Sequence, residues 1–372
     1  MNRILVLAPH WIGDALFTTS ALRRIKEQYP HSECYVLAVP RAAEVFARNP
    51  DVAKILINEQ ELRSFWYFFA LTQKIGRLDF DAVFLFHRSR SRAVCTFLAG
   101  IPLRIGYNTK GRGIFLTHAV ELPGRVMHRV ESLNHLLHEV GMPGKAPAPR
   151  FFVGDATRAA IKERLREFVG HEKFAILNPG GNWLPKRWPA ERFARLAGLL
   201  RSQMALRIVI TGSAKDKILA EEIQRGAETF TPVLSLAGQT TLEELGAVIE
   251  AAEIFISNDS GPLHLAAALG TPVIGLFGPT SAKITGPVGD GKIVILQKDI
   301  GLPVPNPDPN SRDMRYMEAI EVEDVFQAAE NILTQDSITH SGDRNNVWLS
   351  PSSLQAKETI YISHPLPKKG RG

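Results

Sequence analysis

The sequence is poor in cysteine and has no long apolar run. Its 372 residues include two cysteines, Cys34 and Cys95, which are too few for a disulfide framework or a cysteine-rich zinc site. The first apolar run ends at Pro9, well short of the core of a signal peptide. No later stretch approaches the roughly 18 uncharged apolar residues of a membrane-spanning helix. These absences predict a cytoplasmic protein.

Two glycine-rich signatures of nucleotide binding are also absent. No predicted strand is followed by G-x-G-x-x-G, which argues against an NAD-dependent oxidoreductase. Gly106 and Gly111 have the spacing of a P-loop, but Arg112 occupies the position where that loop carries lysine. The glycine patterns therefore support neither class of protein.

Charge is distributed unevenly along the chain. The net charge of +6 divides into +8 for residues 1–152 (20 Lys and Arg, 12 Asp and Glu), −4 for residues 153–335 (19 against 23) and +2 for residues 336–372 (5 against 3). A basic first part indicates an anionic partner, and a phosphorylated sugar, an acidic membrane surface or nucleic acid would fit. Nucleic acid is the weakest of these, because no recognised binding motif accompanies the charge. An uneven solvated surface without a partner is the remaining interpretation.

Strands and helices are predicted to alternate through most of the chain. Apolar runs such as Arg3–Ala8 and Ala82–Phe86 precede segments with helical periodicity, which is typical of βαβ units and parallel sheets. A proline-rich break at Pro143–Pro149 separates two such series. The sequence thus predicts an α/β protein with two Rossmann-like, doubly wound domains, 1–152 and 153–335, that face a cleft. Residues 336–372 are polar and aperiodic, and are predicted to form a mobile tail.

The first candidate site follows the opening strand. In the turn Trp11–Asp14, Gly13 permits a tight bend and Asp14 lies at the start of the next helix. A helix dipole favours a carboxylate there, so Asp14 is a candidate proton acceptor. Aspartate is also a common helix N-cap, and the residues alone leave both roles open.

The second candidate site is the loop Asn178–Pro189. Its paired glycines permit a close approach of the backbone to a ligand, and Lys186 and Arg187 carry the charge to meet a diphosphate. A basic loop without a ligand is the alternative. A weaker signal is Asp216, a few residues beyond the predicted strand Arg207–Thr211, where nucleotide-binding folds place an acidic residue on the ribose.

The third candidate site is the segment Ser257–Gly270, predicted as strand, turn and helix. Ser260 and Gly261 present amides at the N-terminus of the helix, which is a ready anion site. Asp259 at the strand tip can accept hydrogen bonds from sugar hydroxyls, and His264 lies one turn into the helix on the same side. A capped helix with a satisfied histidine is the alternative.

These three segments together resemble glycosyltransferase family 9. The segments are HWIGDALFTTSALRRIKEQYP (residues 10–30), NPGGNWLPKRWPAERFARLA (178–197) and SNDSGPLHLAAALGTPVIGLFGPT (257–280), and the resemblance extends from residue 1 to residue 332. Within the family they are most similar to the branch that transfers heptose from ADP-heptose to lipopolysaccharide. The resemblance implies a GT-B architecture, in which the second domain binds most of the donor.

The resemblance also implies a reaction and a set of site residues. The expected reaction is inverting transfer of L-glycero-D-manno-heptose from ADP-heptose to the heptosyl-Kdo inner core, with Asp14 as general base. No cofactor or metal is required, and stimulation by Mg²⁺ is left open. The implied donor-binding residues are Asn182, Lys186, Asp216, Thr240, Asp259, Ser260, Gly261 and His264.

The implied acceptor gives the basic first domain a partner. A Kdo-containing lipid A core carries carboxylates and often phosphates, which places the enzyme peripherally at the cytoplasmic face of the inner membrane. Arg88, Arg90 and Arg92 follow the strand Ala82–Phe86 at its carboxyl end and are expected to contact this acceptor. Solvated arginines are the alternative. The aromatic run Phe65–Phe69 is expected to pack into the core rather than to touch the membrane.

Three other functions are consistent with the residues. One is another family member, which would add a first or third heptose or a hexose. A second is a metal-dependent GT-A enzyme that uses the D-x-D pattern Asp79–Asp81, although this pattern precedes a strand instead of ending one. A third is a non-catalytic nucleotide-binding module. The segment before the last predicted helix lacks the cysteines that family members of this type often carry, so it forms neither a thiolate metal site nor a disulfide.

Overall fold

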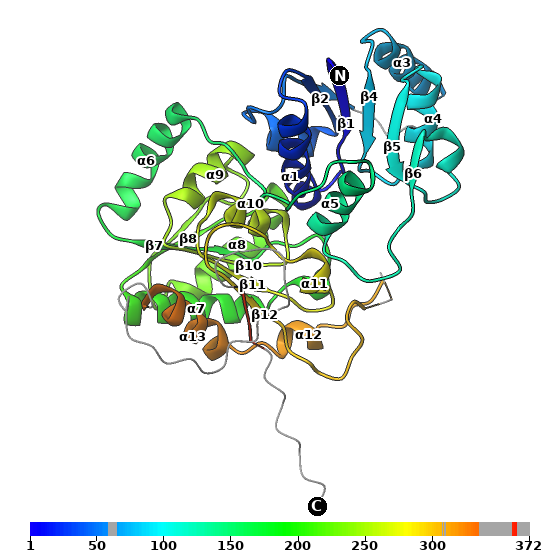
Figure 1. Cartoon of the computed structure of the whole chain (residues 1–372). Coiled ribbons are helices and arrows are strands. Elements are labelled where there is room, and N and C mark those ends of the chain that lie inside the picture. Colours follow the sequence, from blue (N-terminus) through cyan, green and yellow to red (C-terminus); the bar gives the residue numbers. More distant parts are fainter. Residues whose placement is uncertain (59–64, 307, 309, 335–358, 363–372) are drawn as a thin grey trace, which may run out of the picture. The chain divides into compact units, whose positions relative to one another are not determined.

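The computed structural model describes residues 1–58, 65–306, 308, 310–334 and 359–362. Contacts divide the chain into two units, Met1–Phe152 and Val153–Gly372, so the division falls just after the proline-rich break. Within the described ranges every strand pairing is parallel. Helices cover the sheet of each unit (Figure 1).

Unit 1 contains a six-stranded sheet in the order β3-β2-β1-β4-β5-β6. Its strands are β1 (Arg3–Leu7), β2 (Glu33–Ala38), β3 (Lys54–Ile57), β4 (Ala82–Leu85), β5 (Leu103–Tyr107) and β6 (His118–Val120). Its helices are α1 (Ile12–Gln28), α2 (Pro40–Ala43), α3 (Phe65–Gly76), α4 (Arg90–Leu98) and α5 (Arg129–Glu139), with short 3₁₀ turns η1 (Glu44–Phe46) and η2 (Gly113–Phe115).

The core of unit 1 follows from its unbroken apolar strands. Every residue of β4 is buried, as expected for a parallel strand with helices on both sides. Leu5, Val83 and Leu85 lie in one buried cluster with residues of α3 and α4. Helices α1 and α5 pack against each other, as do α3 and α4 (Figure 1).

Unit 2 contains a seven-stranded sheet in the order β13-β12-β11-β10-β7-β8-β9. Its strands are β7 (Phe174–Asn178), β8 (Arg207–Ile210), β9 (Val233–Ser235), β10 (Ile254–Asn258), β11 (Val273–Leu276), β12 (Ile293–Leu296) and β13 (Thr359–Ile362). Its helices are α6 (Asp155–Val169), α7 (Ala190–Met204), α8 (Lys217–Ala227), α9 (Leu242–Glu250), α10 (Gly261–Leu269), α11 (Ala282–Thr285), α12 (Arg315–Glu318) and α13 (Val322–Thr334), with 3₁₀ turns η3 (Leu184–Lys186) and η4 (Ala214–Asp216).

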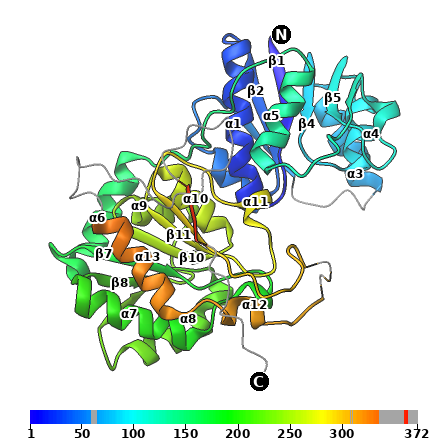
Figure 2. The same cartoon turned by 60° about the horizontal axis from the view of Figure 1, so that its bottom comes forward.

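One large apolar cluster holds unit 2 together. Alternate residues of its strands pack against α7, α8 and α13, and α7 contacts both other helices (Figure 2). Trp188 is buried in this cluster, and its indole N–H donates to the carbonyl of Ile320 at 2.8 Å. The hydrogen bond ties the loop after β7 to the segment before α13, and thereby fixes the loop that carries Lys186.

Most predicted elements are confirmed within a few residues of their ends, and two differ. The sequence also predicts a helix over Ala42–Arg48, and the structure has instead the short helix α2 followed by the turn η1, since Pro40 begins the helix and it ends after one turn. The predicted mobile tail lies mostly outside the described residues, but β13 lies within it and pairs in parallel with β12. In the ranges that the structure describes, no helix has the length and apolarity to cross a membrane.

Candidate active site

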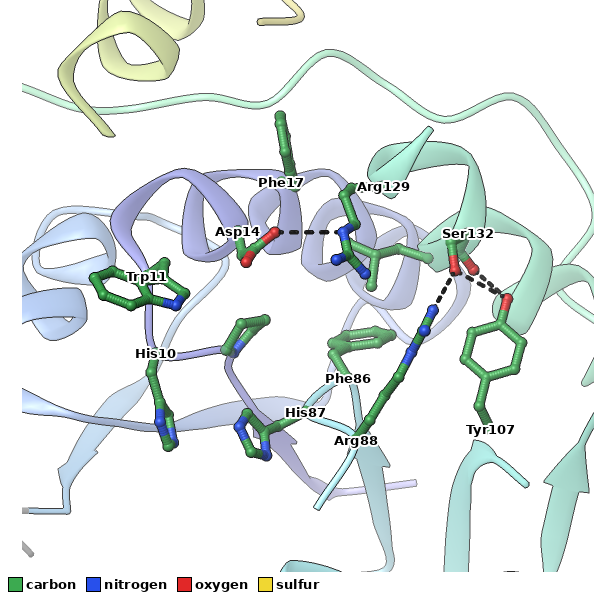
Figure 3. Close-up of a pocket in the computed structure, with 12 residues that line it drawn as sticks. His10, Trp11, Asp14, Phe17, Phe86, His87, Arg88, Tyr107, Arg129 and Ser132 are labelled. Carbon is green, nitrogen blue, oxygen red and sulfur yellow. Dashed lines mark hydrogen bonds and ion pairs between the residues drawn. The ribbon is translucent and has the colours of Figure 1, made fainter. Parts of the chain in front are cut away.

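The order of the first sheet reverses between β1 and β4, which is the point where open α/β sheets bind ligands. A pocket of about 230 Å³ lies there, beyond the carboxyl ends of both strands (Figure 3). The turn after β1 and the segment after β4 form much of its wall, and α5 closes another side. The lining residues are Pro9, His10, Trp11, Asp14, Phe17, Phe86, His87, Arg88, Tyr107, Arg129, Ser132 and Leu133.

Asp14 lines this pocket from the first turn of α1. The helix begins at Ile12 with Trp11 as its N-cap, so Asp14 is the third helical residue and not the N-cap. Its carboxylate lies 4.0 Å from Nε of Arg129, which begins α5 (Figure 3). A carboxylate in the first turn also interacts favourably with the helix dipole. The capping role that the sequence left open is thus excluded, and the side chain forms part of the pocket wall.

Two arginines give the pocket its positive charge. Arg88 is half-buried, donates to the hydroxyl of Ser132 at 3.4 Å and lies over the ring of Tyr107 at 5.5 Å. Burial, and then the neighbouring Arg129, lower the pKa of the Arg88 guanidinium from its usual value. Two cations beside one carboxylate favour an anionic ligand, because a ligand anion relieves their mutual repulsion.

The other two predicted acceptor arginines lie elsewhere. Arg90 is exposed at the start of α4 and does not line the pocket. Arg92 is buried in the same helix near Cys95 and Tyr67, and burial lowers its pKa. Arg88 precedes the helix, and residues two positions apart in a helix point in different directions, so the alternation Arg-Ser-Arg-Ser-Arg does not place three guanidinium groups on one surface.

Two histidines that the sequence did not single out complete this pocket. His10 and His87 stack with ring centroids 4.3 Å apart. Burial, followed by the charges of His10 and nearby arginines, lowers the pKa of His87 to about 4. The fully buried Arg112 donates to the His87 carbonyl at 2.6 Å and fixes this strand end. His87 is therefore neutral at physiological pH.

The second sheet reverses its order between β7 and β10. Here Asn178 at the end of β7 donates to the hydroxyls of Ser257 at 3.0 Å and Ser260 at 3.2 Å, and accepts from Thr211 at 3.2 Å. Asn258 donates to the carbonyl of Pro179 at 2.7 Å. These bonds join the ends of three strands and hold the loops that the sequence predicts to bind the donor.

Lys186 and Asp259 form a partly buried ion pair in unit 2. Nζ of Lys186 lies 2.6 Å from Oδ2 of Asp259, and Thr280 donates to the same oxygen at 2.7 Å. The other carboxylate oxygen lies 3.9 Å from Nε2 of His264, which is buried in α10. Ser260 is the N-cap of α10 and Gly261 its first residue. Five of the predicted donor residues are thus brought together at one helix N-terminus.

The three remaining predicted donor residues lie in other loops of unit 2. Asp216 is buried, and its Oδ2 accepts from the backbone and hydroxyl of Ser213 at 2.9 and 2.6 Å. These bonds form a helix cap, so one oxygen of this carboxylate already has a structural use. Thr240 is half-buried directly before α9, and Asn182 is exposed next to Gly181 in the loop after β7.

Arg187 supports the loop instead of facing the ion pair. It donates to the carbonyl of Gly181 at 2.8 and 2.6 Å and lies 3.7 Å from Asp216. The sequence did not predict that Lys186 pairs with Asp259 while Arg187 supports the loop. It also did not single out Thr280, Tyr107 or Arg129. Thr280 ends the segment 257–280, but nothing in that segment marks it as a partner of Asp259, and Tyr107 and Arg129 stand in no motif.

The D-x-D pattern does not form a metal site. Asp81 accepts hydrogen bonds from the backbone N–H groups of Asn2 and Arg3, and these bonds lower its pKa. The pattern thus fixes the start of β1 against β4. Over the described ranges, no group of three or more His, Cys, Asp or Glu side chains is arranged to hold a metal ion.

A family model described as glycosyltransferase family 9 (heptosyltransferase) matches residues 68–303. The chain belongs to glycosyltransferase family 9. It is 30% identical over 306 residues to lipooligosaccharide heptosyltransferase 2 of Haemophilus influenzae, with 78% of this chain and 88% of that protein covered. It is 27% identical to lipopolysaccharide heptosyltransferase 3 of Escherichia coli K12, with 90% and 98% covered.

A solved structure matches over nearly the whole chain. The structure of E. coli ADP-heptose LPS heptosyltransferase II superposes with a TM-score of 0.77 and 25% identity, covering 91% of this chain and 100% of that one. The predicted family, the α/β GT-B fold and the assignment as a glycosyltransferase are thereby confirmed.

Proposed function

We propose that this glycosyltransferase transfers L-glycero-D-manno-heptose from ADP-heptose to the heptosyl-Kdo inner core of lipopolysaccharide, as heptosyltransferase II does. The observation that carries the proposal is Asp14, a carboxylate in a basic pocket at the switch point of the first sheet. The names of the relatives support the donor and the acceptor class.

The second unit is proposed to bind ADP-heptose. Anions bind at helix N-termini because the amides there lack intrahelical partners, and α10 begins with Ser260 and Gly261. Lys186 is held beside this N-terminus through its ion pair with Asp259. In the proposed complex Lys186 turns to the diphosphate, and Asp259 accepts hydrogen bonds from heptose hydroxyls. Asp216, Thr240 and Asn182 are proposed to border the adenosine and the sugar.

The proposed reaction is a single displacement with inversion. The acceptor hydroxyl forms a bond to the anomeric carbon while the bond to the diphosphate oxygen breaks on the opposite face. Asp14 takes the hydroxyl proton as the new bond forms. The charge that develops on ADP is met by Lys186 and by the N-terminus of α10. Because cations of the protein meet this charge, we propose that transfer proceeds without a metal, and EDTA added to the assay tests this point.

The first unit is proposed to bind the anionic core. Arg88 and Arg129 lie in the pocket with Asp14, where they can bind a carboxylate or phosphate of the acceptor. Arg90 is exposed and can contact an acceptor that extends beyond the pocket, whereas Arg92 is buried and would need α4 to move before it could do so. The lipid-linked acceptor would bring the enzyme to the cytoplasmic face of the inner membrane.

The experiment is transfer of heptose from ADP-heptose to defined acceptors, with wild type and Asp14→Asn compared. Asn keeps the size of the side chain and cannot accept the proton. We expect product with the heptosyl-Kdo acceptor, a loss of at least about a hundredfold in kcat for the variant, and unchanged ADP binding. Full activity of Asp14→Asn would remove Asp14 as the base, and absence of ADP binding in wild type would contradict the donor.

A second acceptor is supported by one observation. Lipopolysaccharide heptosyltransferase 3 of E. coli is similar to this chain to nearly the same degree, with 27% identity over 346 residues against 30% over 306 residues for the Haemophilus heptosyltransferase 2. An acceptor that already carries two heptoses separates the two activities. Transfer to it, with none to the heptosyl-Kdo acceptor, would replace the proposed acceptor and leave the donor unchanged.

A further inference from the structure

Unit 1 exposes large apolar side chains on α3, α4 and η2. Helices α3 and α4 lie side by side (Figures 1 and 2), and η2 contacts α4. We call these five residues the apolar strip. Their exposed fractions run from 45% for Phe97 to 78% for Ile114. They are Trp66 and Phe69 on α3, Phe97 and Leu98 on α4, and Ile114 in η2.

The members of the strip are connected by contacts. Phe69 and Leu98 line one groove between α3 and α4. Phe97 packs edge-on against Phe115, the neighbour of Ile114, with ring centroids 5.7 Å apart. Phe69 with Leu98, and Phe97 with the pair Ile114–Phe115, thus form groups of neighbouring apolar side chains, which differ from apolar residues scattered singly over a soluble protein.

Core packing does not explain these side chains. Tyr67 and Phe68 pack against the buried cluster of unit 1, and Leu71 is buried in it. The inner face of α3 is thus already used, and Trp66 and Phe69 lie away from it. The expectation that the aromatic run packs into the core holds for Tyr67 and Phe68 and fails for Trp66 and Phe69, while the side chain of Phe65 lies outside what the structure describes.

The strip lies in the most basic part of the chain. Residues 65–115 contain eight Lys and Arg and two Asp and Glu; Arg92 and Arg112 are buried and Arg88 lines the pocket, which leaves five cations that can face a membrane. Lys74, Arg77 and Lys110 are exposed, and the guanidinium of Arg104 lies 5.3 Å from the ring centre of Phe97. Aromatic side chains bordered by cations match the chemistry of an anionic membrane surface, where rings enter the headgroup layer and cations meet phosphates.

We propose that the apolar strip is a docking surface for an anionic lipid bilayer. This proposal rests on the proposed function in one respect, because a lipid-linked acceptor is reached only at the membrane surface. A protein partner or a second copy of this chain could also cover the apolar strip. Such a contact would not require the excess of positive charge around it.

The test is sedimentation of the full chain with vesicles of phosphatidylglycerol and phosphatidylethanolamine. Ile114→Asp places a charge on the strip. Ile218→Asp is the matched control, since Ile218 is 77% exposed on α8 of unit 2. We expect wild type and Ile218→Asp to bind, and Ile114→Asp to bind at least about tenfold less, in line with the free energy of burying an isoleucine side chain. Binding should fall on phosphatidylcholine vesicles and in high salt.

Three results would overturn the proposal. They are absence of binding to the anionic vesicles, equal binding of Ile114→Asp and Ile218→Asp, and loss of a concentration-dependent oligomer in Ile114→Asp, which would make the strip a contact between copies. Circular dichroism and thermal unfolding check that both variants fold. Transfer to a soluble, delipidated acceptor separates the two proposals, since vesicle binding without transfer would contradict the function alone.

Discussion

Arg88 and Arg129 place two guanidinium groups beside the carboxylate of Asp14, so positive charge exceeds negative charge among the residues that line the pocket of unit 1. Of the three arginines that the sequence predicts as acceptor contacts, one lines this pocket, and Arg129, which was not predicted, also lines it. Charge and strand position could be inferred from the sequence. The direction of each side chain depends on helix phase and on α5, which packs against α1 from a distant part of the chain.

We expect Arg88→Gln and Arg129→Gln to raise the KM for the acceptor by about ten- to a hundredfold, because each removes a charge-assisted hydrogen bond. Arg129→Gln should also lower kcat, since Arg129 lies 4.0 Å from Asp14. Steady-state kinetics with Arg90→Gln as control provide the measurement, because Arg90 is exposed in the same run. An equal rise in KM for all three substitutions would indicate nonspecific electrostatic attraction of the acceptor instead of a defined anion site.

His87 makes the stability of unit 1 depend on pH. Its pKa is about 4 in the folded chain against 6.5 for an ordinary histidine, so the unfolded chain binds more protons between these values. Stability is fully retained above about pH 6.5 and falls as the pH drops to about 4, by on the order of 2–3 kcal/mol because solvent screens part of the effect. We expect His87→Gln to abolish this part of the acid sensitivity.

Urea unfolding of wild type and His87→Gln at several pH values between 4 and 7 measures the effect. His31→Gln is the control, because His31 is exposed. Parallel acid profiles of the wild type and His87→Gln would show that other groups account for the loss of stability.

Helix α10 is seated unusually close to its neighbours. A Cβ atom on Gly289 would lie 1.8 Å from the carbonyl oxygen of Ala267, and one on Gly275 would lie 2.9 Å from the side chain of Leu263. The run of small residues in this helix predicts such close packing from the sequence. It fixes the helix N-terminus, and hence the amides of Ser260 and Gly261 that are proposed to bind the diphosphate.

Gly289→Ala should therefore weaken both the fold and the site. Backbone must move to admit the methyl group, and we expect a loss of about 1–3 kcal/mol in the free energy of unfolding, together with weaker ADP binding. Gly124→Ala is the control, since no described residue comes within 4 Å of the position that its methyl group would take. Urea unfolding measures the free energy of unfolding, and calorimetric titration measures the affinity for ADP. Values for Gly289→Ala equal to those of wild type would contradict the expectation.

At the scale of elements, the sequence predicts the central strands better than the edges. Strands β4 and β7 are buried along their whole length, so their apolar runs are unbroken. Strand β6 has three residues, two of them exposed, and leaves no apolar pattern to detect. Tyr107 ends β5, the neighbour of β6, and Arg129 begins α5, which packs against α1; no motif marks either residue, so both pocket residues escape prediction.

The two units have separate cores, and each places polar loops at its own switch point. The alternation of strands and helices predicts this organisation. The two substrates are proposed to bind to different units. The ion pair of Lys186 and Asp259, proposed for the donor, lies in unit 2, whereas Asp14, proposed for the acceptor, lies in unit 1.

A ligand that binds to only one unit should slow amide hydrogen exchange in that unit and leave the other unit unchanged. We expect ADP to slow amide hydrogen exchange in residues 179–188 and 258–265, because binding stabilises the state that binds and suppresses local opening of these loops. Residues 9–17 around Asp14 should exchange as before. The measurement is hydrogen-exchange mass spectrometry of the full chain with and without saturating ADP, with Lys186→Met as the matched variant in which protection is reduced. Protection confined to residues 9–17 would assign the nucleotide to unit 1 and reverse the proposed roles of the two units.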